Sequence, residues 1–489
     1  MKKVTCYIFL FATLLGMRAQ AQSQYNAELK QAFVLITQMR FDEAKVLVAQ
    51  EEKRQPSNQV TAYLRAAMVC CELFVNEDAG IFDAAQPSLD ELMDEIEEME
   101  EENPFRNLFL AEVYIARATL NGKFKNNIKA AWQFYRAYDL LSQNAIEHPQ
   151  FLPNNIPLGV LHVAIGSLPD DYQTLASLLG FSGSIENGLQ MLHQAYYQLS
   201  ATPSLNFYAN YAGFVYSFVS FQLGVENNST PENLGLKVGD SPFLIYTQAR
   251  IEWSNGNAKR AIHFLNKRPQ KENYTPFYHL DYLQGKMMIG LDPEAATLYF
   301  IKYLKNSPSQ MYIKSSYRYL SWCYLLLGNE TKAAQMRQNV FRYGEAQSGA
   351  DKQALNESKR ELNVTLIKAR VLFDTGLLVK AKNVLLQIAV EECCATPYFK
   401  AEYYYRLGRI HQEMGNTEEA LQWFKKALAV PEVASCYALG NSALQAGTLL
   451  VSTDAKQAYE YLKMALTYKS YPFYEGIHQK AKTALAQLD

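Results

Sequence analysis

The sequence predicts an all-α protein in which antiparallel helix pairs stack into a solenoid and wind as a superhelix. Apolar residues make up 49% of the 489 positions, enough for a large buried core, and they recur at helical spacing along most of the chain. In the second half, a glycine is followed five residues later by an alanine four times, each time between two apolar stretches. These pairs are Gly256 and Ala261, Gly328 and Ala333, Gly376 and Ala381, and Gly415 and Ala420.

The N-terminus has the three parts of a secretory signal peptide. The basic start MKK precedes an apolar run at 4–17, and the sequence AQA at 19–21 forms a cleavage site. We therefore predict a bacterial signal peptide at 1–21 and a soluble mature chain in the periplasm or cell envelope; a buried N-terminal helix is the alternative. No later run reaches the roughly 18–20 uninterrupted apolar residues of a membrane span, so we expect no transmembrane segment in the mature chain.

The clearest repeat occupies 401–431, AEYYYRLGRIHQEMGNTEEALQWFKKALAVP. Gly408 and Ala420 are small where the two helices of a unit would approach closely, and Gly415 is placed to stop the first helix. Counted from Ala401, the small and apolar positions resemble the 34-residue tetratricopeptide (TPR) pattern. This resemblance implies a TPR-type α-α solenoid.

Weaker copies surround this repeat. The pattern divides the chain into an N-terminal helical region at 22–223 with degenerate TPR-like units, a loop at 224–241, and a C-terminal TPR array at 242–489. The acidic stretch at 89–104 predicts an amphipathic helix with a solvated acidic face; an acidic docking site is the alternative. Further units are predicted at 32–48, 110–141, 242–268, 278–308, 314–347, 362–387 and 437–468, with a capping helix at about 473–488.

Three glycines punctuate the stretch LLGFSGSIENGLQML at 178–192. Gly183 and Gly188 have the spacing of a phosphate-binding loop, but the Lys and hydroxyl that must follow are missing. The sequence GFSGS also misplaces the second glycine of a nucleophile elbow. We instead predict that Gly180 and Gly183 allow a sharp turn between helices and that Gly188 allows close helix contact.

A wider stretch at 158–196 includes this segment and a Leu-Pro turn before it. The residues that carry a family signature there are Leu168, Pro169, Leu179, Gly180, Phe181, Ser182, Gly183, Gly188, Leu189 and Leu192. In these residues the stretch resembles the tetratricopeptide repeat protein 39 family. That resemblance implies a helical adaptor without catalytic residues, but the eukaryotic family members are intracellular, so it does not extend to location.

Composition and motifs give no sign of an active site. A formal charge of −2, from 47 basic and 49 acidic residues, argues against nucleic-acid binding. The histidines form no metal-binding pair and no C-x-x-C motif occurs, so we predict no enzyme, cofactor or metal site. The cysteines of the mature chain are interpreted as small packing residues, with disulfides as the alternative: Cys70, Cys71, Cys323, Cys393, Cys394 and Cys436.

We therefore expect a non-catalytic scaffold that binds a protein or peptide segment in a concave groove lined by the first helix of each unit. In the repeat at 401–431 the groove positions are Glu402, Tyr405, Arg409 and Gln412. The alternative for these four residues is an ordinary solvated face. The rival function is carbohydrate binding, as in the helical starch-uptake lipoproteins, although the lipidated cysteine of those proteins is missing here.

Overall fold

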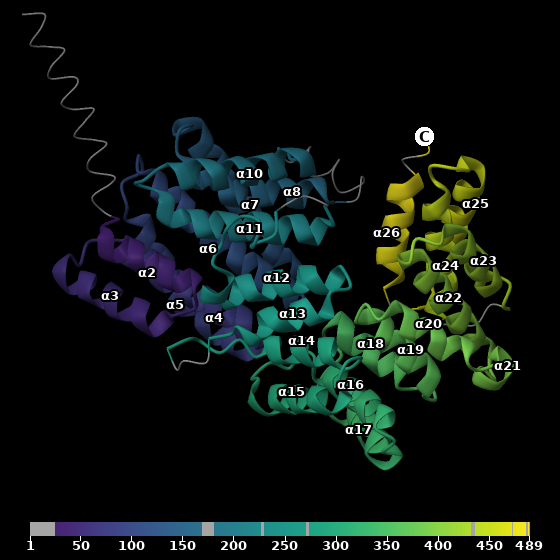
Figure 1. The fold of residues 1–489 in the computed structure, drawn as a ribbon. Coiled ribbons are helices and arrows are strands. Elements are labelled where there is room, and N and C mark those ends of the chain that lie inside the picture. The colour runs from purple at the N-terminus through teal and green to yellow at the C-terminus, as the bar shows by residue number, and fades with distance from the viewer. Residues whose placement is uncertain are drawn as a thin grey trace, which may run out of the picture. The chain divides into compact units, whose positions relative to one another are not determined.

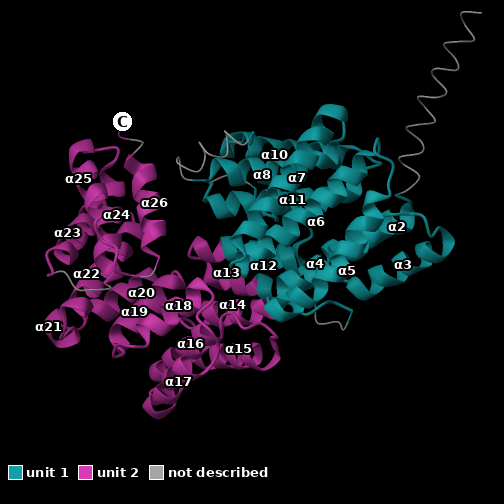
Figure 2. Ribbon diagram, turned by 180° about the vertical axis from the view of Figure 1, so that it is seen from behind, with its two compact units in different colours: residues 1–251, 264–277 teal, residues 252–263, 278–489 magenta. Residues whose placement is uncertain are grey.

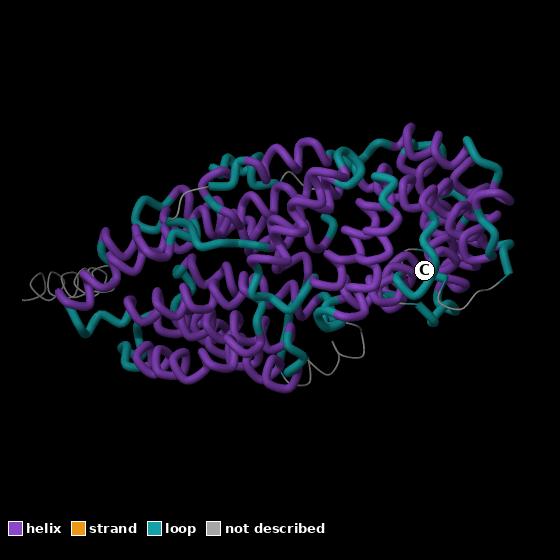
Figure 3. The backbone as a smooth tube through the Cα atoms, turned by 90° about the horizontal axis from the view of Figure 1, so that it is seen from below, coloured by secondary structure: helices purple, strands orange, loops and turns teal. Residues whose placement is uncertain are grey.

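The computed structural model describes residues 25–168, 180–225, 229–269, 273–431, 436–471, 473–485 and 488. Within these ranges the regular structure is helical and no strand occurs (Figures 1 and 3). The predicted all-α class of stacked helix pairs is confirmed. None of the described helices is long and apolar enough to cross a membrane. The predicted signal peptide at 1–21, together with Pro169 and Leu179, lies outside the described residues.

The chain divides into two compact units (Figure 2). Unit 1 comprises residues 1–251 and 264–277, and unit 2 comprises residues 252–263 and 278–489. Two helices cross this division, α12 (Pro242–Ser254) and α13 (Ala258–Asn266).

Unit 1 is built mainly from helices that pack against their neighbours in the chain. The pairs are α2 with α3, α4 with α5, α6 with α7, and α8 with α10. The predicted amphipathic helix at 89–104 corresponds to the end of α5, which buries Leu89, Leu92 and Ile96; Pro104 begins the next helix. The helices are α2 (Ala27–Thr37), α3 (Phe41–Arg54), α4 (Val60–Asn76), α5 (Ala79–Glu97), α6 (Pro104–Lys123), α7 (Asn127–Glu147), α8 (Asn155–Gly166), α10 (Ile185–Ala201) and α11 (Ala209–Leu223), with short 3-10 turns η1 (Leu152–Asn154), η2 (Asn206–Tyr208) and η3 (Val238–Asp240).

The interior of unit 1 is aromatic and surrounds one carboxyl group. Tyr63 of α4 donates a hydrogen bond to Oε2 of Glu112 on α6, and its ring stacks on Phe109 with the centroids 3.8 Å apart. Burial raises the pKa of Glu112 to about 7, and hydrogen bonding by Tyr63 and Tyr211 offsets only part of that rise. We call Glu112 and the surrounding Tyr25, Tyr63, Tyr208 and Tyr211 the tyrosine cluster.

The glycine-rich segment follows α8 and leads into α10. Gly180 has a φ of 86°, a backbone conformation that favours glycine. A Cβ at Gly183 would lie 2.9 Å from Cα of His162, and a Cβ at Gly188 would lie 2.5 Å from the carbonyl oxygen of Gly159. Both glycines therefore stand where this segment and α10 approach the backbone of α8 too closely for a side chain. The hydroxyl of Ser184 caps α10 by accepting a hydrogen bond from the Asn187 amide.

Unit 2 is also built from helix pairs. Its pairs are α14 with α15, α16 with α17, α19 with α20, α22 with α23, and α24 with α25. The last helix, α26, packs on both α24 and α25. The helices are α14 (His279–Met288), α15 (Pro293–Asn306), α16 (Ile313–Leu326), α17 (Glu330–Arg342), α18 (Gly349–Glu357), α19 (Val364–Asp374), α20 (Leu378–Leu386), α21 (Val390–Cys393), α22 (Pro397–Glu413), α23 (Thr417–Leu428), α24 (Tyr437–Leu450), α25 (Ala455–Ala465) and α26 (Tyr474–Leu485).

The repeated glycine-to-alanine interval has one structural meaning throughout. Each glycine lies in the turn after a first helix with a left-handed φ between 73° and 78°. Each alanine lies in the second helix and is at most 2% exposed. In the 401–431 repeat, a Cβ at Gly408 would lie 2.5 Å from the Phe424 ring. The first helix of this pair therefore has no room for a side chain at position 408. The residues are Gly256, Gly328, Gly376 and Gly415, and Ala261, Ala333, Ala381 and Ala420.

Two of these turns, both in unit 2, also touch each other. A Cβ at Gly376 would overlap the carbonyl oxygen of Gly256. Beside them, the indole Nε1 of Trp253 donates a hydrogen bond of 2.7 Å to the carbonyl oxygen of Asp374. We call this contact between the turn at 253–256 and the turn at 374–376 the turn clasp.

Candidate functional site: two adjoining cavities in unit 2

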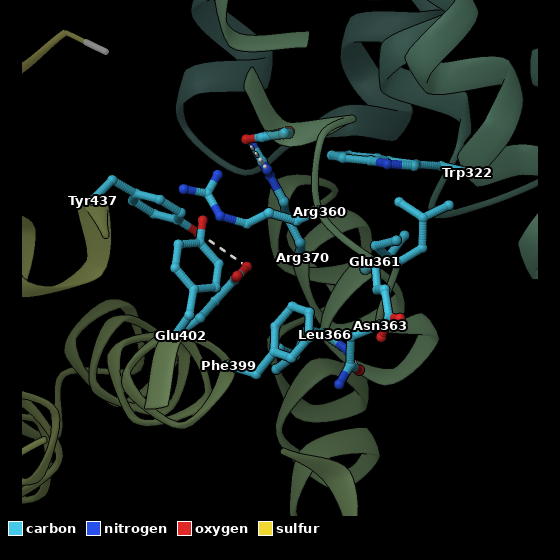
Figure 4. Close-up of a pocket in the computed structure, with 13 residues that line it drawn as sticks. Trp322, Arg360, Glu361, Asn363, Leu366, Arg370, Phe399, Glu402 and Tyr437 are labelled. Atoms are coloured by element: carbon cyan, nitrogen blue, oxygen red, sulfur yellow. Dashed lines mark hydrogen bonds and ion pairs between the residues drawn. The ribbon is translucent and has the colours of Figure 1, made fainter. Parts of the chain in front are cut away.

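Two cavities in unit 2 share three lining residues, Glu357, Tyr398 and Tyr437. One has a volume of about 50 Å³ and lies among α16, α19 and α22 and the 357–363 segment. The other, of about 180 Å³, lies among α18, α24 and α26. We call the two cavities together the inner site, and Figure 4 shows the residues around the first of them.

A partly buried carboxylate at the end of α18 ties two successive first helices together. Glu357 accepts a hydrogen bond of 2.6 Å from Nη1 of Arg318 on α16 and one of 3.1 Å from Nη1 of Arg370 on α19. Burial alone would raise the pKa of Glu357, but the two guanidinium groups outweigh it and lower the pKa to about 2. The carboxyl group is therefore ionised across the physiological pH range.

A second charged group lies across the cavity on α22. Nε of Arg406 donates a hydrogen bond of 3.0 Å to Glu402, while its Nη2 donates one of 2.8 Å to the hydroxyl of Tyr437 on α24. The Tyr437 hydroxyl in turn donates to Glu402 at 3.0 Å, as drawn in Figure 4. Burial lowers the pKa of Arg406, but the nearby Tyr437 and Glu402 more than offset this and raise it. The guanidinium is therefore held as a fixed cation.

The remaining lining offers aromatic rings and polar groups to a ligand. The guanidinium of Arg360 stacks over the Tyr398 ring at 4.5 Å from its centroid. The side-chain amide of Asn356 makes no hydrogen bond with the part of the chain that the structure describes. Asn441 donates to the carbonyl oxygen of Tyr437 on its own helix and keeps its amide oxygen as an acceptor. Tyr471 and Phe473 complete the wall of the larger cavity.

The four groove residues predicted from the sequence do not gather at the inner site. Of the four, Glu402 lines the inner site. It is 9% exposed, and its carboxylate is bound to Arg406. The Tyr405 ring packs between aromatic neighbours on α23 and α24. Arg409 pairs with Glu413 on its own helix at 2.7 Å. Gln412 donates to Gln445 of α24 at 2.9 Å.

Sequence reasoning missed the residues that organise the inner site. Arg318, Arg370 and Arg406 each lie in the first helix of a pair, but these helices carry other charged residues as well, so the sequence does not single out the three arginines. Glu357 gives no signal either, because it ends a short helix between two repeats.

The described residues can be compared with what metal binding and thiol chemistry require: a cluster of ligands and an accessible thiolate. They contain no cluster of three or more His, Cys, Asp or Glu side chains that could hold a metal ion. The thiols are free rather than disulfide-bonded, and burial raises the pKa of Cys323 to about 12, which suppresses the reactive thiolate. The free cysteines are Cys70, Cys71, Cys323, Cys393, Cys394 and Cys436.

The charged groups of the inner site are already paired with one another. Glu357 stays ionised, whereas a general acid or base needs a pKa near the working pH. Charges that are already paired form a rigid wall and do not need a ligand to compensate them.

Comparison with known proteins agrees with a repeat architecture. Residues 153–364 match the family model Iml2/Tetratricopeptide repeat protein 39, and residues 401–430 match the model Tetratricopeptide repeat. No curated protein sequence matches the chain. Among solved structures, the crystal structure of the APC/C hetero-tetramer Cut9-Hcn1 aligns with 13% identity over 93% of this chain and 94% of that chain, with a TM-score of 0.22.

The two family matches fall on different parts of the chain. The Iml2/Tetratricopeptide repeat protein 39 match includes the glycine-rich segment at 180–188, and the tetratricopeptide match coincides with α22 and α23. TPR domains are typically non-catalytic scaffolds that bind other proteins. The helix pairs and the two matches together support a tetratricopeptide-repeat protein, similar over residues 153–364 to Iml2/Tetratricopeptide repeat protein 39.

Proposed function

We propose that this chain is a non-catalytic scaffold of the bacterial cell envelope that binds an extended segment of a partner protein in the inner site. The observation that carries the proposal is the lining of the larger cavity. Tyrosine rings line this cavity together with the amides of Asn356 and Asn441, and amides can hydrogen-bond to both the N–H and C=O groups of a peptide backbone. The paired charges behind them hold this surface in place before a ligand arrives, which lowers the entropic cost of binding.

A peptide selection tests binding at the inner site. Peptides displayed on phage would be selected on the immobilised mature chain, and their affinities measured by calorimetry. We expect Asn356→Ala with Asn441→Ala to weaken the selected peptides by at least about tenfold, because their backbone hydrogen bonds are lost. The matched control is Asn233→Ala, an exposed asparagine of unit 1, which should leave affinity unchanged. Equal affinity for the double variant would remove the inner site from the proposal.

Carbohydrate binding is the second candidate, favoured by the aromatic character of the same cavity. Tyr398, Tyr437, Tyr471 and Phe473 offer ring faces, and the amides offer hydrogen bonds to hydroxyl groups. Calorimetry with a panel of oligosaccharides separates the two candidates. Carbohydrate binding would be favoured if a sugar releases heat with the wild-type chain but not with Asn441→Ala, and if the selection yields no peptide.

Export to the envelope is supported by the signal-peptide pattern and has its own test. Tyr25, four residues after the predicted cleavage point, is already buried against Phe33 and Phe207. Cleavage after Ala21 would leave three residues before Tyr25. N-terminal sequencing of the protein recovered from the periplasmic fraction should begin at Gln22. A cytoplasmic protein that retains Met1 would contradict export.

A further inference from the structure

One face of α7 in unit 1 exposes apolar side chains although the opposite face is buried. Ile128, Trp132 and Tyr135 follow one another at i, i+4 and i+7, so they lie on one side of the helix. Their exposed fractions are 90%, 53% and 44%. We call these three residues the α7 ridge. The buried side of the helix carries Ala130, Gln133, Ala137, Leu140 and Leu141.

Aromatic contacts hold the α7 ridge in position. The Trp132 ring meets the ring of Tyr114 on α6 edge-on, with the centroids 5.8 Å apart. The Tyr135 ring meets that of Phe181 edge-on at 5.6 Å. The Tyr138 hydroxyl accepts a hydrogen bond of 3.0 Å from the backbone amide of Ser182, which fixes the Phe181 segment against α7. The exposed rings are thus preorganised for contact with a partner.

The charge around the α7 ridge is positive. From residue 113 to 138 the sequence contains five basic residues and no acidic one, although the whole chain carries a formal charge of −2. Three of the five are paired with acids from outside this stretch: Arg117, Lys123 and Arg136. Lys125 and Lys129 are exposed and make no ion pair with the described residues. These two cations flank Ile128 in the sequence.

We propose that the α7 ridge docks unit 1 on an anionic lipid bilayer. Tryptophan and tyrosine favour the interface between lipid headgroups and acyl chains, and an isoleucine that is 90% exposed can insert beyond them. The ammonium groups of Lys125 and Lys129 would meet lipid phosphates at the same depth. Lys125 precedes the first turn of α7 and Lys129 directly follows Ile128, so both cations border the exposed apolar residues, and interfacial helices combine apolar and cationic groups in this way. This surface lies in unit 1 and does not depend on peptide binding in unit 2.

Vesicle flotation tests the lipid interaction with the mature chain. Vesicles of equal parts phosphatidylglycerol and phosphatidylcholine should carry the protein upward, while vesicles of phosphatidylcholine alone should carry much less. We expect Ile128→Ser with Trp132→Ser to reduce the bound fraction at least about tenfold, because the inserted apolar surface is lost. Lys125→Gln with Lys129→Gln should weaken binding to the anionic vesicles and reduce its sensitivity to salt.

Two matched controls and one spectroscopic signal make the test specific. Leu298→Ser, at an apolar residue of unit 2 that is 66% exposed, and Lys259→Gln, at an exposed lysine, should both leave flotation unchanged. Trp132→Phe should still bind but lose the blue shift of fluorescence that accompanies insertion. The proposal is overturned if the wild-type chain does not float, or if Ile128→Ser with Trp132→Ser floats equally well. A concentration-dependent dimer that this double variant abolishes would also overturn it, in favour of a second copy of the chain.

Discussion

One glutamate in each unit has a strongly shifted pKa, and the two shifts have opposite signs. Glu112 of unit 1 lies in the tyrosine cluster with hydroxyl groups around it, and its pKa rises to about 7. Glu357 of unit 2 lies between Arg318 and Arg370, and its pKa falls to about 2. Burial raises both pKa values, so the difference comes from the neighbours: hydroxyl groups only partly replace water around a carboxylate, whereas guanidinium groups overcompensate for its loss.

The comparison predicts opposite dependences of stability on pH. A carboxyl group with a raised folded-state pKa stabilises the fold fully below its unfolded value of 4.5, and this contribution is lost as the pH rises through about 7. A carboxyl group with a lowered pKa contributes above 4.5, and its contribution is lost as the pH falls toward about 2. Unit 1 should therefore weaken toward neutral pH and unit 2 toward acid pH.

The largest expected effect comes from removing the carboxylate of unit 2. Glu357→Gln leaves the buried Arg318 and the partly buried Arg370 without their counter-charge, which should cost about 3 kcal/mol of unfolding free energy at pH 7. Urea unfolding measures the loss, and hydrogen exchange with mass spectrometry assigns it to α16, α18 and α19. The matched control is Glu361→Gln, an exposed glutamate nearby, which should change stability little. Similar losses in the two variants would contradict the arginine-held carboxylate.

The next effect concerns unit 1, whose stability should fall as the pH rises toward neutral, whereas that of unit 2 should fall toward acid pH. The wild-type chain should lose up to about 3 kcal/mol of stability in unit 1 as the pH rises from 4.5 through 7, the energy that corresponds to the raised pKa of Glu112. Glu112→Gln carries a neutral amide at every pH, so the protection of α4 and α6 amides, taken relative to their intrinsic exchange rate at each pH, should stay constant in this range. A variant that keeps the wild-type pH dependence would show that another group is responsible.

A smaller effect tests the bridging hydroxyl of the inner site. Tyr437→Phe removes the group that links Arg406 and Glu402 but keeps the ring, so we expect a loss of about 1 kcal/mol. The direct hydrogen bond of Arg406 to Glu402 remains and limits the damage. Urea unfolding is again the measurement. A loss as large as that of Glu357→Gln would mean that the two charged groups act as one network.

The smallest expected effect tests how the tyrosines around Glu112 influence its pKa. Tyr63→Phe removes a hydrogen bond that favours the ionised carboxylate, so the pKa of Glu112 should rise further. The pH at which unit 1 loses stability should then move upward relative to the wild-type chain. Hydrogen exchange of α4 and α6 across a pH series follows the transition. A downward move would show that Tyr63 does not stabilise the charged form.

The fold was readable from the sequence because its signals are local. Gly415 and Ala420 are five residues apart, and both are required by one turn and one helix contact within a single repeat. The left-handed turn needs glycine, and the buried contact between helices needs a small side chain. The same reasoning identified Gly188, which the structure places against the backbone of Gly159.

The inner site was not readable because its contacts join different repeats. Glu357 binds Arg318, 39 residues earlier in the chain, and Arg370, 13 residues later. No single-sequence period connects these positions, because α18 lies between two repeats and is not part of either. Glu402 was predicted to face a groove and does line the inner site, but its carboxylate is bound to Arg406. Repeat position alone cannot distinguish a free side chain from one already paired.

The turn clasp of unit 2 has a consequence for how this array can evolve. Repeat arrays commonly gain or lose units, because each unit contacts only its neighbours. Here the turn at Gly256 touches the turn at Gly376, and the hydrogen bond from Trp253 to Asp374 spans 121 residues. An extra helix pair between them would separate the two turns by about 10 Å for each added helix layer. Duplication or deletion of a unit between 257 and 373 would break the clasp, so we expect the number of units in this stretch to be fixed across descendants of this chain.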